Sequence, residues 1–379
     1  MYNTYARQVQ DQLKQLIRDL CAIPAPSHHE ERRAEFCKAW FEAHGGQGVY
    51  IDEALNVVCP WNVTEDGPVV VIMAHTDTVF PDLEPLPFRE DQDYFYCPGV
   101  CDDTAQLAQL MVCADWFMNH CPPPGTGVLF VANSCEEGLG NLKGCRRIVR
   151  DYGSRMRELI SIDSAEFVAV CNEAVGSHRH RVTVKTEGGH SFGAFGNRNA
   201  IAVLAGLIQA LYSVKVPQEG GSKTTYNVGI ISGGTSVNTI AQEASMLYEY
   251  RSDSRVCLAK METMFRAMID AWNSTGVEVT AELLGERPCT GDVDPARQQA
   301  LVDRAAASMV RTRGLEPRTH SGSTDCNIPL SVGIPAIAIG GCRGIGIHTR
   351  EEKLDLSTLL PGMEYLLDFL HHTFYDAAL

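Results

Sequence analysis

Short, continuously apolar segments rich in β-branched residues alternate along this chain with segments of helical periodicity. Residues 68–74 (PVVVIMA), 127–132 (GVLFVA) and 159–162 (LISI) have the character of strands buried on both faces of a sheet. A helical pattern runs from about 104 to 119, between the first two of them. Strands that alternate with helices predict an α/β fold with a mixed, mostly parallel sheet flanked by helices.

A different pattern occupies the middle of the chain. From residue 181, polar and apolar residues alternate as in a strand with one exposed face, and the predicted elements then follow the order β-α-β-β-α-β of a ferredoxin-like unit. After Pro288 the pattern of buried strands and helices returns. The sequence therefore predicts a discontinuous α/β domain, 1–177 with 289–379, and an inserted α+β domain at 178–288.

Near its beginning, the chain has apolar residues at helical spacing, which predict one helix from about residue 4 to residue 21. Ser27 stands three residues before Glu30, the pattern of a capping box. It predicts that these two side chains cap a second helix, which runs through Trp40.

Composition excludes several classes of protein. Lysine and arginine total 32 against 47 aspartates and glutamates, a formal charge of −15 with no basic run, so nucleic acid is not an expected partner. No stretch approaches the ~18 apolar residues that a membrane span requires, and no signal peptide is visible. Fourteen cysteines spread over a long chain are expected to be reduced and mostly buried, which favours a cytoplasmic protein.

Five groups of histidines and acidic residues stand out, and four of them follow a predicted buried strand, where open α/β sheets expose functional side chains. Taken alone, several have ordinary explanations, such as a solvated histidine at a strand end or an aspartate at a helix start. Adjacent glutamates after a buried strand, however, are costly unless a cation or a proton compensates them. The residues are His75 with Asp77, Asp102 with Asp103, Glu136 with Glu137, Asp163, and His348.

Together these residues predict a site for two metal ions that share a bridging carboxylate. Nitrogen and oxygen ligands without thiolate suit Zn²⁺, with Mn²⁺ or Co²⁺ as alternatives. Paired metals would polarise a carbonyl and supply a hydroxide nucleophile, so hydrolysis is the predicted chemistry.

The order of these motifs through nearly the whole chain resembles the co-catalytic zinc exopeptidases and amidohydrolases, which include peptidase T, carboxypeptidase G, aminoacylase and succinyl-diaminopimelate desuccinylase. The resemblance implies two Zn²⁺ ions per subunit. His75 and Asp163 would bind one ion and Glu137 and His348 the other, with Asp102 as the bridge. It further implies that Glu136 is the general base for a metal-bridged hydroxide and that Asp77 orients His75.

The inserted domain resembles the lid of that family, through which the subunits often form a homodimer. His190, in EGGHS, matches the histidine that stabilises the oxyanion, often from the partner subunit. Asn238 and Arg251 match residues that bind a substrate carboxylate. The alternative to substrate binding for Arg251 is an ion pair with Asp253. Ser323, in GSTD, matches a loop that lines the substrate pocket.

One ligand position narrows the implied activity. The family tends to have aspartate at the position of Asp163 in aminopeptidases and dipeptidases, and glutamate in carboxypeptidases and deacylases. The expected function is therefore that of a zinc-dependent aminopeptidase or tripeptidase acting on short peptides, most similar to peptidase T. The alternatives are a carboxypeptidase, a deacylase of N-acyl amino acids, and, more remotely, a catalytically inactive peptide-binding homologue.

The chain departs from the family pattern at two places. Residues 103–106 (DTAQ) lack the lysine and glycine that usually follow the bridging aspartate, which bears on pocket shape. Cys135 stands where relatives have an acidic or small residue, and a packed structural thiol is the favoured interpretation.

Overall fold

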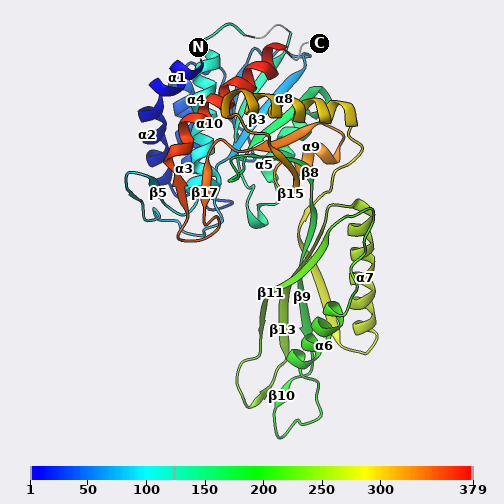
Figure 1. The fold of residues 1–379 in the computed structure, drawn as a ribbon. Coiled ribbons are helices and arrows are strands. Elements are labelled where there is room, and N and C mark those ends of the chain that lie inside the picture. The colour runs from blue at the N-terminus through cyan, green and yellow to red at the C-terminus, as the bar shows by residue number, and fades with distance from the viewer. Residues whose placement is uncertain (1, 123–124, 377–379) are drawn as a thin grey trace. The chain divides into compact units, whose positions relative to one another are not determined.

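The computed structural model describes residues 2–122 and 125–376, which fold into two compact units (Figure 1). Unit 1 consists of Met1–Ala174 and Gly291–Leu379, and unit 2 of Val175–Thr290. These limits differ by a few residues from the domain boundaries expected from the sequence. Residues 1, 123–124 and 377–379 of the predicted α/β domain lie outside the described part. No helix in that part is both long and apolar enough to span a bilayer.

Unit 1 is built on an eight-stranded mixed sheet in the order β1-β2-β6-β3-β7-β16-β8-β15. The pairs β3/β6, β3/β7, β7/β16 and β8/β15 are parallel, which agrees with the predicted mixed, mostly parallel sheet. Its strands are β1 (Tyr50–Ile51), β2 (Val57–Trp61), β3 (Val69–His75), β6 (Gly127–Asn133), β7 (Met156–Ile162), β8 (Ala169–Ala174), β15 (Arg318–Gly322) and β16 (Ala336–Ile339). A smaller antiparallel sheet contains β4 (Arg89–Glu90), β5 (Tyr94–Tyr96), β17 (Arg343–Ile345) and β18 (Lys353–Asp355).

Both faces of the large sheet are covered, which explains its unbroken apolar strands. Successive side chains of a strand point to opposite faces. Val70 and Ile72 of β3 therefore join one core with α4 and α10, whereas Val71 and Met73 join another with α5 and α9. The helices of unit 1 are α1 (Tyr2–Gln8), α2 (Gln10–Cys21), α3 (Glu31–Ala43), η1 (Val100–Thr104), α4 (Ala105–Met118), η2 (Gly138–Gly140), α5 (Lys143–Tyr152), η3 (Gly153–Arg155), α8 (Pro295–Arg313), α9 (Asn327–Ser331), η4 (Leu356–Thr358), α10 (Leu359–His371) and η5 (His372–Asp376).

Unit 2 is an antiparallel sheet in the order β11-β13-β9-β14, with two helices packed on it. This order and the alternation of strands and helices confirm the ferredoxin-like prediction. Val182 and Val184 of β9 point into the core that contains Leu207 and Phe265 of the two helices. The elements are β9 (Gly176–Lys185), β10 (Gly189–His190), α6 (Ala200–Tyr212), β11 (Thr224–Gly233), β12 (Thr239–Ile240), β13 (Glu243–Ser252), α7 (Arg255–Asn273) and β14 (Glu278–Arg287).

The structure corrects two expectations for the first part of the chain. The single predicted helix is two helices, because Val9 has ψ 3° and interrupts the helical geometry. The predicted capping box is wrong: Glu30 stands at the N-cap of α3 but makes no side-chain cap hydrogen bond. Both side chains have partners far away in the sequence, Asp77 for Ser27 and Cys135 for Glu30. All fourteen cysteines are free, and every one except Cys121 is buried.

Candidate metal centre

Three adjacent parallel strands bring the predicted ligands to one edge of the large sheet. β6, β3 and β7 are neighbours and run in the same direction. His75 ends β3, Glu137 follows β6, and Asp163 follows β7. The carboxyl ends of parallel strands meet at the same edge, so residues far apart in the sequence become neighbours there.

Asp102 lies between two groups of possible ligands. Ligand atoms of His75, Asp102 and Asp163 lie within 4.8 Å of one another, and so do those of Asp102, Glu137 and His348. Asp102 Oδ1 is 3.0 Å from His75 Nε2, and Asp102 Oδ2 is 3.0 Å from His348 Nε2. The two oxygens of one carboxylate thus face two separate groups, as a bridging ligand must. A third group joins His75, Glu136 and Glu137.

The site concentrates acidic side chains, and their pKa values reflect it. Burial first, and then the neighbouring carboxylates of Asp102 and Asp325, raise the pKa of Asp163 to about 7, although His75 opposes the shift. Burial also favours a higher pKa for Asp102, but hydrogen bonds with His348 and His75 outweigh it and hold that pKa below its ordinary value. Hydrogen bonds to Asp102 and Glu137 raise the pKa of His348 to about 10.

These shifts indicate that the carboxylates require positive charge close by. Protonated His75 and His348 would supply part of it. Divalent cations could take the place of these protons, because the donors would then be neutral imidazole nitrogens and carboxylate oxygens. That donor set, without thiolate, fits Zn²⁺ and also Mn²⁺ or Co²⁺. The residues present therefore fit a metal centre.

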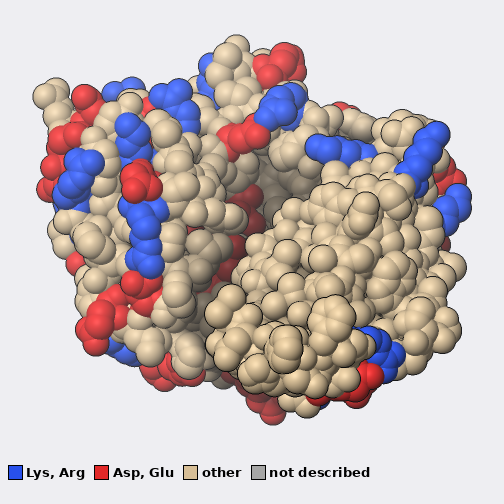
Figure 2. All heavy atoms as spheres, turned by 90° about the horizontal axis from the view of Figure 1, so that it is seen from below, with Lys and Arg blue, Asp and Glu red and all other residues tan. Residues whose placement is uncertain are grey.

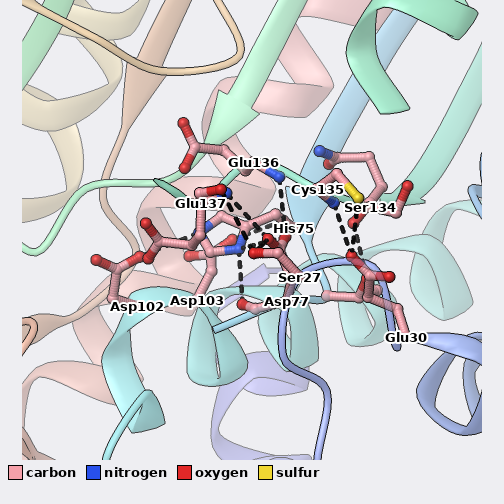
Figure 3. A network of polar contacts seen from close by, with 12 residues as sticks. Ser27, Glu30, His75, Asp77, Asp102, Asp103, Ser134, Cys135, Glu136 and Glu137 are labelled. Atoms are coloured by element: carbon pink, nitrogen blue, oxygen red, sulfur yellow. Dashed lines mark hydrogen bonds and ion pairs between the residues drawn. The ribbon is translucent and has the colours of Figure 1, made fainter. Parts of the chain in front are cut away.

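Asp77 connects the first histidine to the loop after β6 (Figure 3). His75 Nδ1 lies 3.0 Å from the backbone oxygen of Asp77 and 3.4 Å from its Oδ1. The backbone N–H of Glu136 donates to Asp77 Oδ1 and that of Glu137 to Asp77 Oδ2, each at 2.9 Å. One fully buried carboxylate therefore touches both the imidazole of His75 and the backbone of the glutamate pair.

Two further buried carboxylates hold the backbone of the site: Asp103, to which the sequence reasoning gave no separate role, and Glu352, which it did not single out. Glu352 Oε1 accepts hydrogen bonds from the N–H groups of Cys101 (2.8 Å) and Asp102 (3.1 Å), and its Oε2 accepts one from Gly99 (2.9 Å). Asp103 Oδ2 accepts the N–H of His75 at 2.9 Å. Glu352 follows His348 closely in the sequence, but nothing local distinguishes it from its exposed neighbour Glu351.

The predicted residues of unit 2 fall at two separate places. β10 pairs with β12, and the N–H of Ser191 donates to Asn238 O at 3.0 Å, so His190 and Asn238 lie together. Arg251 lies eight residues beyond Glu243, the first residue of β13, which corresponds to roughly 27 Å along the strand. Within unit 2, Arg251 is therefore distant from the other two residues.

Arg251 forms an ion pair with Glu249 and not with Asp253, the partner considered from the sequence. Its Nε and Nη2 each lie 3.0 Å from the carboxylate of Glu249, which occupies the same face of β13. Asp253 lies beyond the end of that strand and accepts the N–H of Lys223. In unit 1, Ser323 directly follows β15, at the end of a strand that is parallel to β8.

Comparisons with known proteins agree with this architecture. The sequence model of peptidase family M20/M25/M40 matches residues 71–372. A succinyl-diaminopimelate desuccinylase of Bordetella petrii is 26% identical over 313 residues, which cover 78% of this chain and 80% of that protein. The crystal structure of a tripeptidase from Staphylococcus aureus has a TM-score of 0.75 at 24% identity, over 95% of this chain and 97% of that one. A dinuclear metal-binding peptidase of family M20 from Bacillus subtilis has a TM-score of 0.65 at 16% identity, over 97% of this chain and 99% of that one.

Proposed function

The chain belongs to peptidase family M20/M25/M40, and we propose that it is a two-metal aminopeptidase that removes the N-terminal residue of short peptides. As a member of this family, the chain is a hydrolase of amide bonds. The family resemblance identified in the sequence is therefore confirmed. The observation that carries the proposal is the placement of Asp102, whose two oxygens face separate groups of ligand atoms. Aspartate at position 163 and the likeness to a tripeptidase support the aminopeptidase branch.

The ligands divide into two sets around Asp102. In our proposal His75 and Asp163 hold one cation, Glu137 and His348 hold the other, and Asp102 contacts both. Zinc is the proposed metal, and the same donors accept Mn²⁺ or Co²⁺. When bound, such cations polarise the scissile carbonyl and lower the pKa of a water molecule.

Glu136 performs the proton transfers in this proposal. Its carboxylate belongs to the same group as His75 and Glu137, close to the proposed ligands without being counted among them. It accepts a proton from the attacking water and returns it to the leaving amine. Asp77 keeps the imidazole of His75 oriented and the backbone of Glu136 in place.

The remaining predicted residues bind substrate and stabilise charge. His190 donates a hydrogen bond to the developing oxyanion, a contribution of about 3 kcal/mol for a single donor. Arg251 leaves Glu249 and pairs with the C-terminal carboxylate of the peptide, which its planar guanidinium matches. Asn238 and Ser323 complete the peptide contacts.

We further propose that a second copy of this chain contributes His190 and Asn238, because they lie far from Arg251 within one unit 2. The end of unit 2 that carries β10 exposes three large apolar side chains: Phe192 at 89%, Phe195 at 92% and Val237 at 102% of their reference areas. Few charged side chains lie on this end (Figure 2). Strand β11 also leaves one edge of its sheet unpaired within the described residues. An apolar surface with few charges beside an open edge suits association between identical units.

A panel of free di- and tripeptides, with N-acetylated and C-amidated counterparts, tests the activity. Protein stripped of metal and reloaded with Zn²⁺, Mn²⁺ or Co²⁺ is expected to release the N-terminal residue of free peptides only. Acetylation should block cleavage because an aminopeptidase requires a free amine.

The second candidate is an N-acyl-amino-acid deacylase, which the similarity to a succinyl-diaminopimelate desuccinylase favours. Cleavage of only the acylated members of the panel, or of N-succinyl amino acids added to it, would replace the aminopeptidase proposal with this one.

A further inference from the structure

Two buried carboxylates hold three consecutive backbone N–H groups of the loop that bears Glu136. The N–H of Cys135 donates to Glu30 Oε1 at 3.0 Å, and the next two N–H groups donate to Asp77. Glu30 and Asp77 are both completely buried. Figure 3 shows the two acids on the same side of the loop. Each backbone N–H from residue 135 to residue 137 thus donates a hydrogen bond to a buried carboxylate.

A buried carboxylate such as that of Glu30 is an energetically unfavourable partner for a backbone N–H. Its oxygen Oε1 accepts the N–H of Cys135 and also the S–H of the same residue at 3.2 Å, and both of these donors are neutral groups. Burying a carboxylate is unfavourable, and a neutral oxygen could accept the same hydrogen bonds. Hydrogen bonds to an ionised acceptor are shorter and stronger, however, so the charge gives a firmer hold on the backbone.

The backbone held in this way has an uncommon conformation. Cys135 has φ +56°, in the left-handed region that residues other than glycine seldom adopt. Its carbonyl accepts the N–H of Leu142 at 3.0 Å, so both backbone polar groups of Cys135 are hydrogen-bonded. Such a conformation persists where the surroundings enforce it, often beside functional groups.

The segment that carries Glu30 is itself anchored to the sheet. Arg33, in the first turn of α3, donates to the backbone oxygens of Thr76 (2.8 Å), Leu20 (2.9 Å) and Ile23 (2.6 Å). Ser27, in the same segment, donates to Asp77 Oδ2 at 2.6 Å. The segment precedes residue 71, where the match to the family model begins. This segment therefore supports the site although it lies outside the region that the family model matches.

We propose that Glu30 is a positioning residue for Glu136: by holding the peptide N–H of Cys135 it fixes the turn that aims the Glu136 carboxylate at the reacting water. The inference rests on the proposed function, in which Glu136 is the general base. Glu30 acts through the backbone N–H, so the thiol of Cys135 is dispensable. A misplacement of about 1 Å in a reacting group can lower the rate about 100-fold.

The test compares Glu30→Leu, Glu30→Gln and Cys135→Ala in the metal-loaded protein. Glu30→Leu is expected to lower kcat about 100-fold, with KM and bound metal within about twofold of wild type. Glu30→Gln, which keeps an acceptor oxygen, should recover at least a tenth of the wild-type kcat. Cys135→Ala keeps the amide and should retain kcat within about threefold.

Glu158→Leu is the matched control, because Glu158 is also a buried acid of unit 1 but is paired with Arg304 away from the proposed ligands. It should lower the melting temperature and leave kcat unchanged. A fall in kcat equal to that of Glu30→Leu would show that loss of any buried acid slows the enzyme, and the proposal would be overturned. Unchanged kcat in a folded, metal-loaded Glu30→Leu would overturn it as well.

Amide hydrogen exchange provides a readout that needs no substrate. Glu30→Leu should accelerate exchange at residues 135–137, whereas Glu158→Leu should not. Unchanged exchange at these amides would refute the role of Glu30 even if every peptide is cleaved. Conversely, wild-type protein that cleaves no peptide would refute the proposed function, while faster exchange in Glu30→Leu would still support the hold on the loop. If Glu30→Leu does not fold, the same measurements of kcat and amide exchange on Glu30→Gln and Cys135→Ala test the proposal.

Discussion

Replacing Glu352 by leucine should weaken both the fold of unit 1 and its affinity for metal. The carboxylate is 1% exposed and accepts the N–H groups of Gly99, Cys101 and Asp102. Leucine leaves these three donors inside the protein without that acceptor. Because Asp102 is the proposed bridge between two cations, the loss reaches the metal centre through the backbone.

The expected loss of stability follows from two opposing terms. An unsatisfied buried donor costs about 2 kcal/mol, so three of them cost about 6 kcal/mol. Burial raises the pKa of Glu352 to about 7, and removing this group returns about 3 kcal/mol of ionisation cost at neutral pH. The net loss of about 3 kcal/mol corresponds to a decrease in melting temperature of about 6–12 °C for a unit of this size.

Two assays separate the two effects. Thermal unfolding in excess chelator measures the stability of the metal-free protein, and competition with a chromogenic chelator measures Zn²⁺ affinity. We expect affinity to fall about 10- to 100-fold, the usual effect of removing a group that supports a ligand. Glu351→Leu, at the exposed neighbouring position, is the matched control and should change neither quantity. A Glu352→Leu protein with wild-type affinity and a melting temperature within 2 °C, roughly the effect of 1 kcal/mol or less, would refute the reasoning.

Three further outcomes are expected. Glu136→Gln should keep its metal and lower kcat by about 100-fold or more, and a metal-loaded variant with substantial turnover would remove Glu136 as the base. Arg251→Ala should raise KM for peptides with a free carboxylate but not for amidated ones, and an equal loss on both sets would contradict the clamp. Burial, together with His178, lowers the pKa of His180 to about 4, below the ordinary 6.5. The stability it contributes is therefore complete above pH 6.5 and lost as pH falls towards 4. His180→Phe should lessen the decrease in urea midpoint across this window, and an identical pH profile would exclude this histidine as a cause.

The periodic patterns of the sequence were enough to predict the fold class and the edge of the sheet that carries the candidate site. Unbroken apolar runs such as 69–74 arise because both faces of the sheet are covered, and that condition acts on every residue of the strand. Parallel strands then place His75 and Asp163 at one edge without further information. Local periodicity and strand direction therefore determine which residues gather there.

The partners of individual polar and charged side chains were decided by the tertiary structure alone. Ser27 and Glu30 have the spacing of a capping box, yet they bind groups 50 and 105 residues away. Glu352 holds a loop 250 residues before it, and Arg251 pairs with Glu249 instead of Asp253. The physical reason is that a hydrogen bond or ion pair depends on which atoms lie within about 3 Å, and distant segments become neighbours only when the chain has folded. Sequence periodicity records which face of an element is buried, but it carries no record of what lies opposite that face.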